Sequence, residues 1–196
     1  MTESARTAPP SQVAELALAC VDYVRRAVGA ELDYTPDTLP ILDEYLRKAR
    51  GTAQAEIVRL VAPAVGAYFG EVLRRSFDCR WHAPGSEFSS WRVEFARCFL
   101  YFNPIGMAVE AIQLEDTAGL GATIVTSDDA LADLRAQLER AAPVRVEDYY
   151  ALTTRFEVID QIVHFLMVRS RELGTGREYD ADFYRAQAKD EPPAQA

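Results

Sequence analysis

Apolar residues recur every three or four positions along much of the chain, and this spacing is typical of amphipathic helices. Residues that favour helix starts and ends, such as Ser, Asp, Pro and Gly, stand between these stretches. The pattern predicts five or six helices, which cover residues 11–28, 39–50, 53–76, 104–112, 127–141 and 146–173.

The helix predicted over residues 53–76 is the most apolar of the set. Its hydrophobic residues cover more than half of the helix circumference, which is typical of a helix in the middle of a bundle. Pro63 lacks a backbone N–H and is expected to kink the helix. Gly66 and Gly70 lie one turn apart, and each costs about 1 kcal/mol relative to alanine. We therefore expect another backbone to approach this face closely.

A different pattern follows this helix. Residues 79–83, 91–96 and 98–102 are rich in aromatic and β-branched side chains, with turn residues between them. Alternation within 91–96 predicts a half-buried strand, and residues 122–126 are a further candidate. The sequence therefore predicts an α+β fold, in which about five to six helices pack on a small antiparallel sheet of two to four strands.

Two residues mark the passage from the sheet to the next helix. Asn103 is of a type that accepts hydrogen bonds from the first free N–H groups of a helix. Pro104 follows it, and proline is favoured at the first helical position because its N–H is not needed there. We expect the helix over 104–112 to begin at this pair.

The length of 196 residues suits a single domain that can bury a core without disulfides or metals. Residues 11–174 carry the periodic pattern and form this domain. Residues 1–10 are small and polar, and we expect them to be disordered. Residues 175–196 are polar with scattered aromatics, which predicts a loosely docked or disordered tail.

The charge balance argues against two classes of partner. The chain carries 30 acidic and 21 basic residues, a net charge of −9. Nucleic-acid and anionic-lipid binding both depend on an excess of Lys and Arg. No stretch reaches the ~18 uncharged apolar residues of a membrane span. We therefore expect neither nucleic acid nor membrane as a partner.

Three cysteines, Cys20, Cys79 and Cys98, are an odd number, and no two have Cys-x-x-Cys spacing. This pattern does not favour a disulfide scaffold. We therefore expect a reducing, cytoplasmic location and buried thiols.

Motifs for metals, cofactors and catalysis are weak. Cys79 and His82 have the spacing of half a zinc site, but residues three apart on a strand point to opposite faces. His164 has no partner at metal-binding spacing. No phosphate loop, nucleophile elbow or His-Glu-x-x-His motif is present. We therefore assign no catalytic residue, metal or cofactor.

Glu71 stands out because it interrupts the most apolar helix. A buried carboxylate has a raised pKa and can act as a general acid or base. The alternative is an ion pair with Arg74 or Arg75, three and four residues further on, and we favour this interpretation. If the helix end instead forms a ligand site, its residues would be Tyr68, Glu71, Arg75 and Trp81.

A family resemblance rests on several of these residues in order. They are the Tyr-Thr-Pro-Asp-Thr-Leu run over 34–39, the Gly-x-Tyr-x-Gly-Glu helix over 66–71, Trp81 and Asn103-Pro104. Together they resemble an uncharacterised bacterial family, a domain of unknown function, over residues 32–112. The resemblance implies a domain of helices and a small sheet, with Gly66, Gly70, Asn103 and Pro104 as structural positions. It implies no activity.

Two functions follow as hypotheses. The first is a non-enzymatic, cytoplasmic bacterial protein that acts through protein–protein interaction, as an adaptor, regulator or immunity-type factor. The second is a small-ligand sensor or enzyme with a pocket at the helix–sheet junction around Glu71 and Trp81. The sequence names neither the partner nor the oligomeric state.

Overall fold

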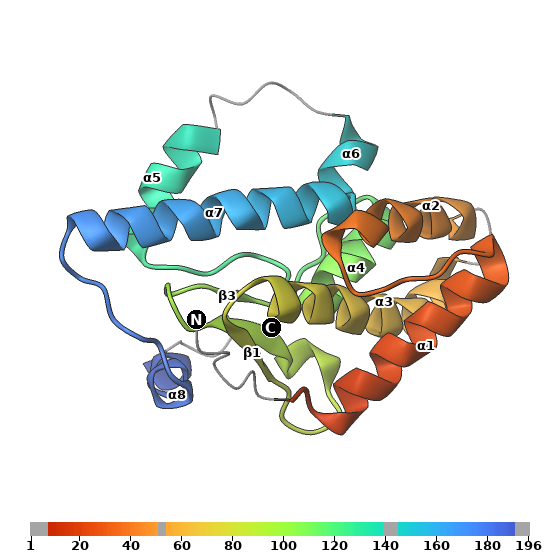
Figure 1. The fold of residues 1–196 in the computed structure, drawn as a ribbon, viewed down its shortest axis with the longest axis horizontal. Coiled ribbons are helices and arrows are strands. Elements are labelled where there is room, and N and C mark those ends of the chain that lie inside the picture. Colours follow the sequence, from red (N-terminus) through yellow and green to blue (C-terminus); the bar gives the residue numbers. More distant parts are fainter. Residues whose placement is uncertain (1–7, 51–53, 139–144, 191–196) are drawn as a thin grey trace.

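The computed structural model describes residues 8–50, 54–138 and 145–190 (Figure 1). These residues form eight helices and a three-stranded antiparallel sheet, so the predicted α+β class is confirmed. The helices are α1 Ser11–Val28, α2 Leu39–Ala49, α3 Gln54–Ser76, α4 Pro104–Gln113, α5 Asp128–Leu138, α6 Val146–Tyr150, α7 Leu152–Glu172 and α8 Ala181–Asp190; the strands are β1 Cys79–His82, β2 Arg92–Phe95 and β3 Tyr101–Phe102. Of residues 1–10, for which disorder is predicted, residues 1–7 lie outside the described residues.

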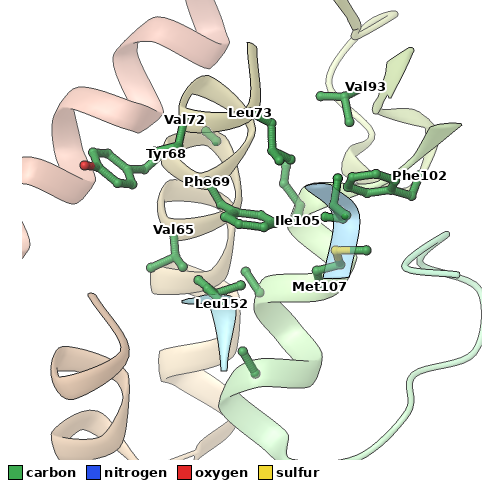
Figure 2. Packing of buried hydrophobic residues seen from close by; sticks show 14 of the residues in the cluster. Val65, Tyr68, Phe69, Val72, Leu73, Val93, Phe102, Ile105, Met107 and Leu152 are labelled. Atoms are coloured by element: carbon green, nitrogen blue, oxygen red, sulfur yellow. The ribbon is translucent and has the colours of Figure 1, made fainter. Parts of the chain in front are cut away.

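Helix α3 is the centre of the fold, as its apolar circumference predicts. Every residue from 62 to 74 is buried, and the helix packs against α1 on one side and α4 on the other. Figure 2 shows Phe69 pointing towards Ile105 and Phe102, while Tyr68 points to the opposite side of α3. A helix that buries its whole circumference lets one element hold two others in place.

The sheet has the strand order β1-β2-β3. Cys79 of β1 pairs with Phe95 of β2, and Val93 of β2 pairs with Phe102 of β3. Strand β3 is shorter than predicted. Residues 122–126 add only one isolated bridge, between Tyr101 and Val125, in place of a full strand.

The second face of β2 is buried, where alternation predicted a solvent-facing side. Glu94 on that face is only 2% exposed. The segment after α7 runs back to the sheet, and α8 places the Tyr184 ring there. The Tyr184 hydroxyl lies 2.8 Å from the Phe95 carbonyl oxygen and 3.1 Å from the Leu100 carbonyl oxygen, and it accepts a hydrogen bond from the Leu100 N–H. Within residues 175–190, where the polar sequence predicted a loosely docked or disordered tail, the chain contacts the sheet through the buried Tyr184 and through the Tyr179 N–H, which donates to the Ala96 carbonyl at 2.9 Å.

The predicted helix over 146–173 is in fact two helices. Ala151 has an extended backbone (φ −60°, ψ 134°) that separates α6 from α7. The Asp43 carboxylate of α2 accepts hydrogen bonds from the N–H groups of Leu152 and Thr153 at 2.8 and 3.1 Å, and from the Thr153 hydroxyl at 2.6 Å. A carboxylate from another helix therefore caps α7, because the first N–H groups of any helix need acceptors.

Candidate functional site

The helix–sheet junction holds a buried ion pair. Glu71 on α3 is only 3% exposed. Arg74, one turn further on, donates from Nε to Oε1 and from Nη2 to Oε2 of Glu71, both at 2.8 Å. The indole Nε1 of Trp81 on β1 donates to Oε1 at 3.0 Å. The interpretation of Glu71 as an ion-pair partner is confirmed, and the partner is Arg74.

This arrangement suits a structural role for both charges. A two-pronged Arg–carboxylate contact is among the strongest hydrogen-bonded pairs in proteins. The hydrogen bond to Glu71 raises the pKa of Arg74, with burial acting in the opposite direction. Both carboxylate oxygens of Glu71 already accept hydrogen bonds, which leaves little capacity for proton transfer to a substrate.

The two glycines of α3 explain how its neighbours come so close. A Cβ at Gly66 would collide with the backbone of Ile105 at the start of α4, so the predicted backbone approach is confirmed there. A Cβ at Gly70 would instead collide with the Trp81 ring. Gly70 thus makes room for the indole that reaches Glu71, and Gly66 makes room for α4.

Tyr68 and Arg75 belong to a separate group on another side of α3. The buried Tyr68 hydroxyl accepts from the Tyr34 N–H and shares a hydrogen bond with the Thr38 hydroxyl, both at 2.9 Å. The Tyr34 ring stacks on the Tyr68 ring at 4.9 Å between centroids. The exposed Arg75 guanidinium carbon lies 3.9 Å from the Tyr34 centroid. Tyr34 has φ +64°, a conformation uncommon outside glycine.

The four predicted ligand residues therefore do not converge on one cavity. Glu71 and Trp81 contact each other, whereas Tyr68 and Arg75 are linked through Tyr34. None of the four lines either of the two surface hollows described below. Their role in ligand binding stays a prediction.

Asn103 and Pro104 hold the start of α4 as predicted. The Asn103 side-chain oxygen accepts from the Ile105 N–H at 2.9 Å, and its amide donates to the Phe88 carbonyl at 2.7 Å. Its backbone N–H donates to the Gly121 carbonyl at 2.7 Å. Asn103 thus caps α4 with its side chain and, through its side chain and its backbone, ties the helix start to Phe88 and Gly121, which positions the helix end that packs on Gly66.

A second buried carboxylate, Glu94 on β2, was missed by the sequence reasoning. Its two oxygens lie 3.0 Å from Arg92 Nε and 3.2 Å from Arg80 Nε. The alternation of residues 91–96 predicted that Glu94 lies on the other face of the strand from Val93, but it also predicted that this face is exposed to solvent. The Tyr184 ring of α8 lies on this part of the sheet, against Tyr101 and 5.4 Å from the guanidinium of Arg80, which pairs with Glu94.

Metal binding, thiol reactivity and membrane insertion find little support in the described part of the chain. No group of three or more His, Cys, Asp or Glu side chains there could hold a metal ion. Burial raises the pKa of the Cys98 thiol to about 12, and it raises that of Cys20 further. These thiols stay protonated, and therefore poorly nucleophilic, at neutral pH. Among the helices described, none has the length and apolar character needed to cross a membrane.

A surface hollow lies between the C-terminal end of α4 and the short helix α6. It has a volume of about 360 Å³. We call it the α4–α6 hollow, and it is lined by Leu114, Glu115, Asp116, Val146, Tyr149 and Tyr150. Val146 and Tyr149 are 59% and 54% exposed. The sequence reasoning missed this hollow because it treated α6 as the first turn of a longer helix.

A second hollow, of about 160 Å³, lies between the sheet edge, the start of α5 and the end of α7. Its one basic lining residue, Arg169, is paired with Asp129 at 2.8 Å and with Asp133 at 3.2 Å. Its charges are therefore balanced within the protein.

Comparisons with known proteins add no further identification. No family model, no curated protein and no solved structure matches the chain. The resemblance to a bacterial domain of unknown function therefore stays a prediction, and the function is argued from the geometry alone.

Proposed function

We propose that this protein acts by binding another protein, as a cytoplasmic bacterial adaptor, regulator or immunity-type factor without catalytic activity of its own. The observation that carries the proposal is the α4–α6 hollow, where large apolar side chains stay exposed beside carboxylates. Exposed apolar surface with a polar rim is typical of protein interaction sites. Buried, protonated thiols are consistent with a reducing compartment.

The alternative hypothesis, a sensor or enzyme at the helix–sheet junction, has less support. Its central carboxylate, Glu71, is bonded to Arg74 and Trp81 and lines neither hollow. Nucleic acid is a poor candidate partner because the chain has a net charge of −9.

The proposal is tested by affinity capture from a lysate of the source cells with the tagged full-length protein. Captured proteins are identified by mass spectrometry, purified, and mixed again with this protein. We expect one protein to form a stoichiometric complex, measured by calorimetry and by light scattering. The same material is screened for metabolites that raise the unfolding temperature, since a ligand of the folded state stabilises it by mass action.

The outcome that overturns the proposal is the absence of any reconstituted complex together with a metabolite that raises the unfolding temperature. That result would favour the sensor or enzyme hypothesis instead. A reconstituted complex supports the proposal wherever on the surface the partner binds.

A further inference from the structure

We infer that the α4–α6 hollow receives an arginine side chain from a basic segment of the partner protein. The inference rests on the proposed function, because it supposes that the partner is a protein. It adds the chemical class of the partner surface and the place where that surface docks.

The walls of the hollow fit the body of an arginine side chain. Val146 and Tyr149 present exposed apolar surface, and the Tyr149 and Tyr150 rings meet edge to face with centroids 4.9 Å apart. Long basic side chains lay their aliphatic stems along such surface and keep the charged end free. A guanidinium also stacks well on an aromatic face.

Two of the residues that line the hollow are acidic. Glu115 and Asp116 line it directly after the end of α4. Leu114 closes that helix in the left-handed conformation, with φ 58°, and its N–H donates to the Glu110 carbonyl at 2.7 Å. The C-terminal end of a helix carries partial negative charge, and here the half-buried Arg50 guanidinium donates to the Ala111 carbonyl in the last turn of α4 at 2.7 Å, which offsets part of that charge.

Two arginines close to lining residues of the hollow are already paired with carboxylates. Arg145, next to the wall residue Val146, donates to Asp148 at 2.7 Å. Arg155, whose guanidinium lies 5.3 Å from the Tyr150 centroid, donates to Glu110 at 2.8 Å. Each of these cations is balanced by a carboxylate outside the hollow, so the negative charge of Glu115 and Asp116 still favours an incoming cation.

Tyr150 keeps the Asp116 carboxylate in place without neutralising it. Its hydroxyl donates to Asp116 Oδ1 at 3.0 Å. Desolvation and the neighbouring Asp116 raise the pKa of Tyr150, so the hydroxyl remains a neutral donor at physiological pH. The second oxygen of Asp116 and the side chain of Glu115 are the groups that would meet a guanidinium.

The size of the hollow favours a side chain over a larger element. Its volume of about 360 Å³ is at the lower end of the roughly 300–1,000 Å³ that ligand sites span. A basic segment with one anchored arginine fits this space, and the net charge of −9 attracts such a segment over a longer range.

The test is a titration of the ¹⁵N-labelled full-length protein with the synthetic peptide Ala-Arg-Leu-Arg-Ala, followed by amide chemical shifts. The control peptide carries citrulline in place of both arginines, which keeps the shape and removes the charge. We expect saturable shifts confined to residues 114–116 and 146–150, and about tenfold weaker binding of the citrulline peptide, which corresponds to about 1.4 kcal/mol.

Two pairs of variants locate the site. Glu115→Lys should weaken binding of the arginine peptide about tenfold, while Glu15→Lys, the same charge change at an exposed position of α1 outside the hollow, should weaken it at most about twofold. Tyr149→Ala should weaken it about fivefold, and Tyr149→Phe should leave it unchanged because the ring remains.

Shifts elsewhere, equal binding of both peptides, or equal effects of Glu115→Lys and Glu15→Lys would each overturn the inference. The unfolding temperature of every variant is measured alongside, so that loss of the fold is not mistaken for loss of binding. A captured partner that binds the Glu115→Lys variant as tightly as the native protein would overturn this inference and leave the proposed function standing. Peptide binding at the hollow without any protein partner would support the arginine site and count against the proposed function.

Discussion

The helix–sheet junction and the α4–α6 hollow contain the same kinds of groups, but these groups are buried and paired at the junction and exposed in the hollow. Each combines carboxylates with aromatic side chains. At the junction, Glu71 is 3% exposed and bonded through both oxygens to Arg74 and Trp81. In the hollow, Tyr149 is 54% exposed and the carboxylates line an open surface. The unusual sequence around Glu71 thus reflects tight internal packing, while the segments that form the proposed partner surface are ordinary in sequence.

The difference has an energetic basis. A charge held away from water is stable only with its partners, so removal of one partner costs several kcal/mol. Exposed charges and side chains contribute little to the free energy of unfolding, because water solvates them in both states. Stability measurements and binding measurements should therefore respond to different residues, and four predictions test this in order of expected effect.

Glu71→Ala should lower the free energy of unfolding by about 3–5 kcal/mol, because it leaves the buried Arg74 guanidinium without its carboxylate. Chemical denaturation measures the loss. The double variant Glu71→Ala with Arg74→Ala should cost less than the sum of the two single changes. A cost below about 1 kcal/mol for Glu71→Ala would mean that the pair is not held as tightly as the geometry indicates.

Gly66→Ala should destabilise the fold by about 2 kcal/mol or more, because the new Cβ collides with the Ile105 backbone. This cost opposes the gain of about 1 kcal/mol that alanine brings to a helix. Thermal unfolding measures the change. Gly176→Ala serves as the control, since its new Cβ would come no closer than 3.9 Å to the Ser170 side chain. An unchanged or raised unfolding temperature for Gly66→Ala would contradict the close approach of α4.

Tyr184→Phe should cost about 1 kcal/mol, since it removes the hydroxyl that bonds the Phe95 and Leu100 carbonyls. Burial raises the pKa of Tyr184, so the folded state keeps the hydroxyl protonated where the unfolded chain loses the proton. This contribution is therefore complete below about pH 10 and is lost as the pH rises further.

The native protein should accordingly lose stability above about pH 10 more steeply than Tyr184→Phe does. Denaturation curves across this pH range give the comparison. Tyr179→Phe, on the segment that leads into α8, is the matched control and should keep the native pH profile. Identical profiles for the native protein and Tyr184→Phe would show that this hydroxyl does not anchor the tail.

Glu115→Lys and Tyr149→Ala should change the free energy of unfolding by less than about 0.5 kcal/mol, because both side chains lie at the surface. The same variants should weaken binding of the arginine peptide. Losses of stability comparable to that of Glu71→Ala would erase the distinction between the two regions. In that case the hollow would be part of the core, and its exposed apolar groups would need another explanation.

Much of the fold could be predicted because it depends on neighbours in sequence. The apolar circumference of α3, the cap at Asn103 and the close approach at Gly66 all follow from local spacing and residue type. The choice of Arg74 as the partner of Glu71 was narrowed by helix geometry to two residues, and the structure selects one of them.

The features that could not be predicted depend on residues far apart in the chain. The break before Leu152 needs the Asp43 carboxylate from a different helix. The buried Glu94 pairs with Arg80, and the Arg80 guanidinium lies against Tyr184, which returns to the sheet from the C-terminal segment. No local sequence pattern predicts these two features, because each of them depends on contacts between elements that lie far apart in the chain.

The sequence by itself determined the class of the fold, the central position of α3 and the internal role of Glu71, since helical periodicity and side-chain size act over a few residues. Only the tertiary structure decided where the proposed partner surface lies. The α4–α6 hollow exists because α6 ends at Ala151 and lies against the end of α4, which joins residues 114–116 to residues 146–150. Such a juxtaposition arises from the packing of the helices, and the sequence of neither segment alone predicts it.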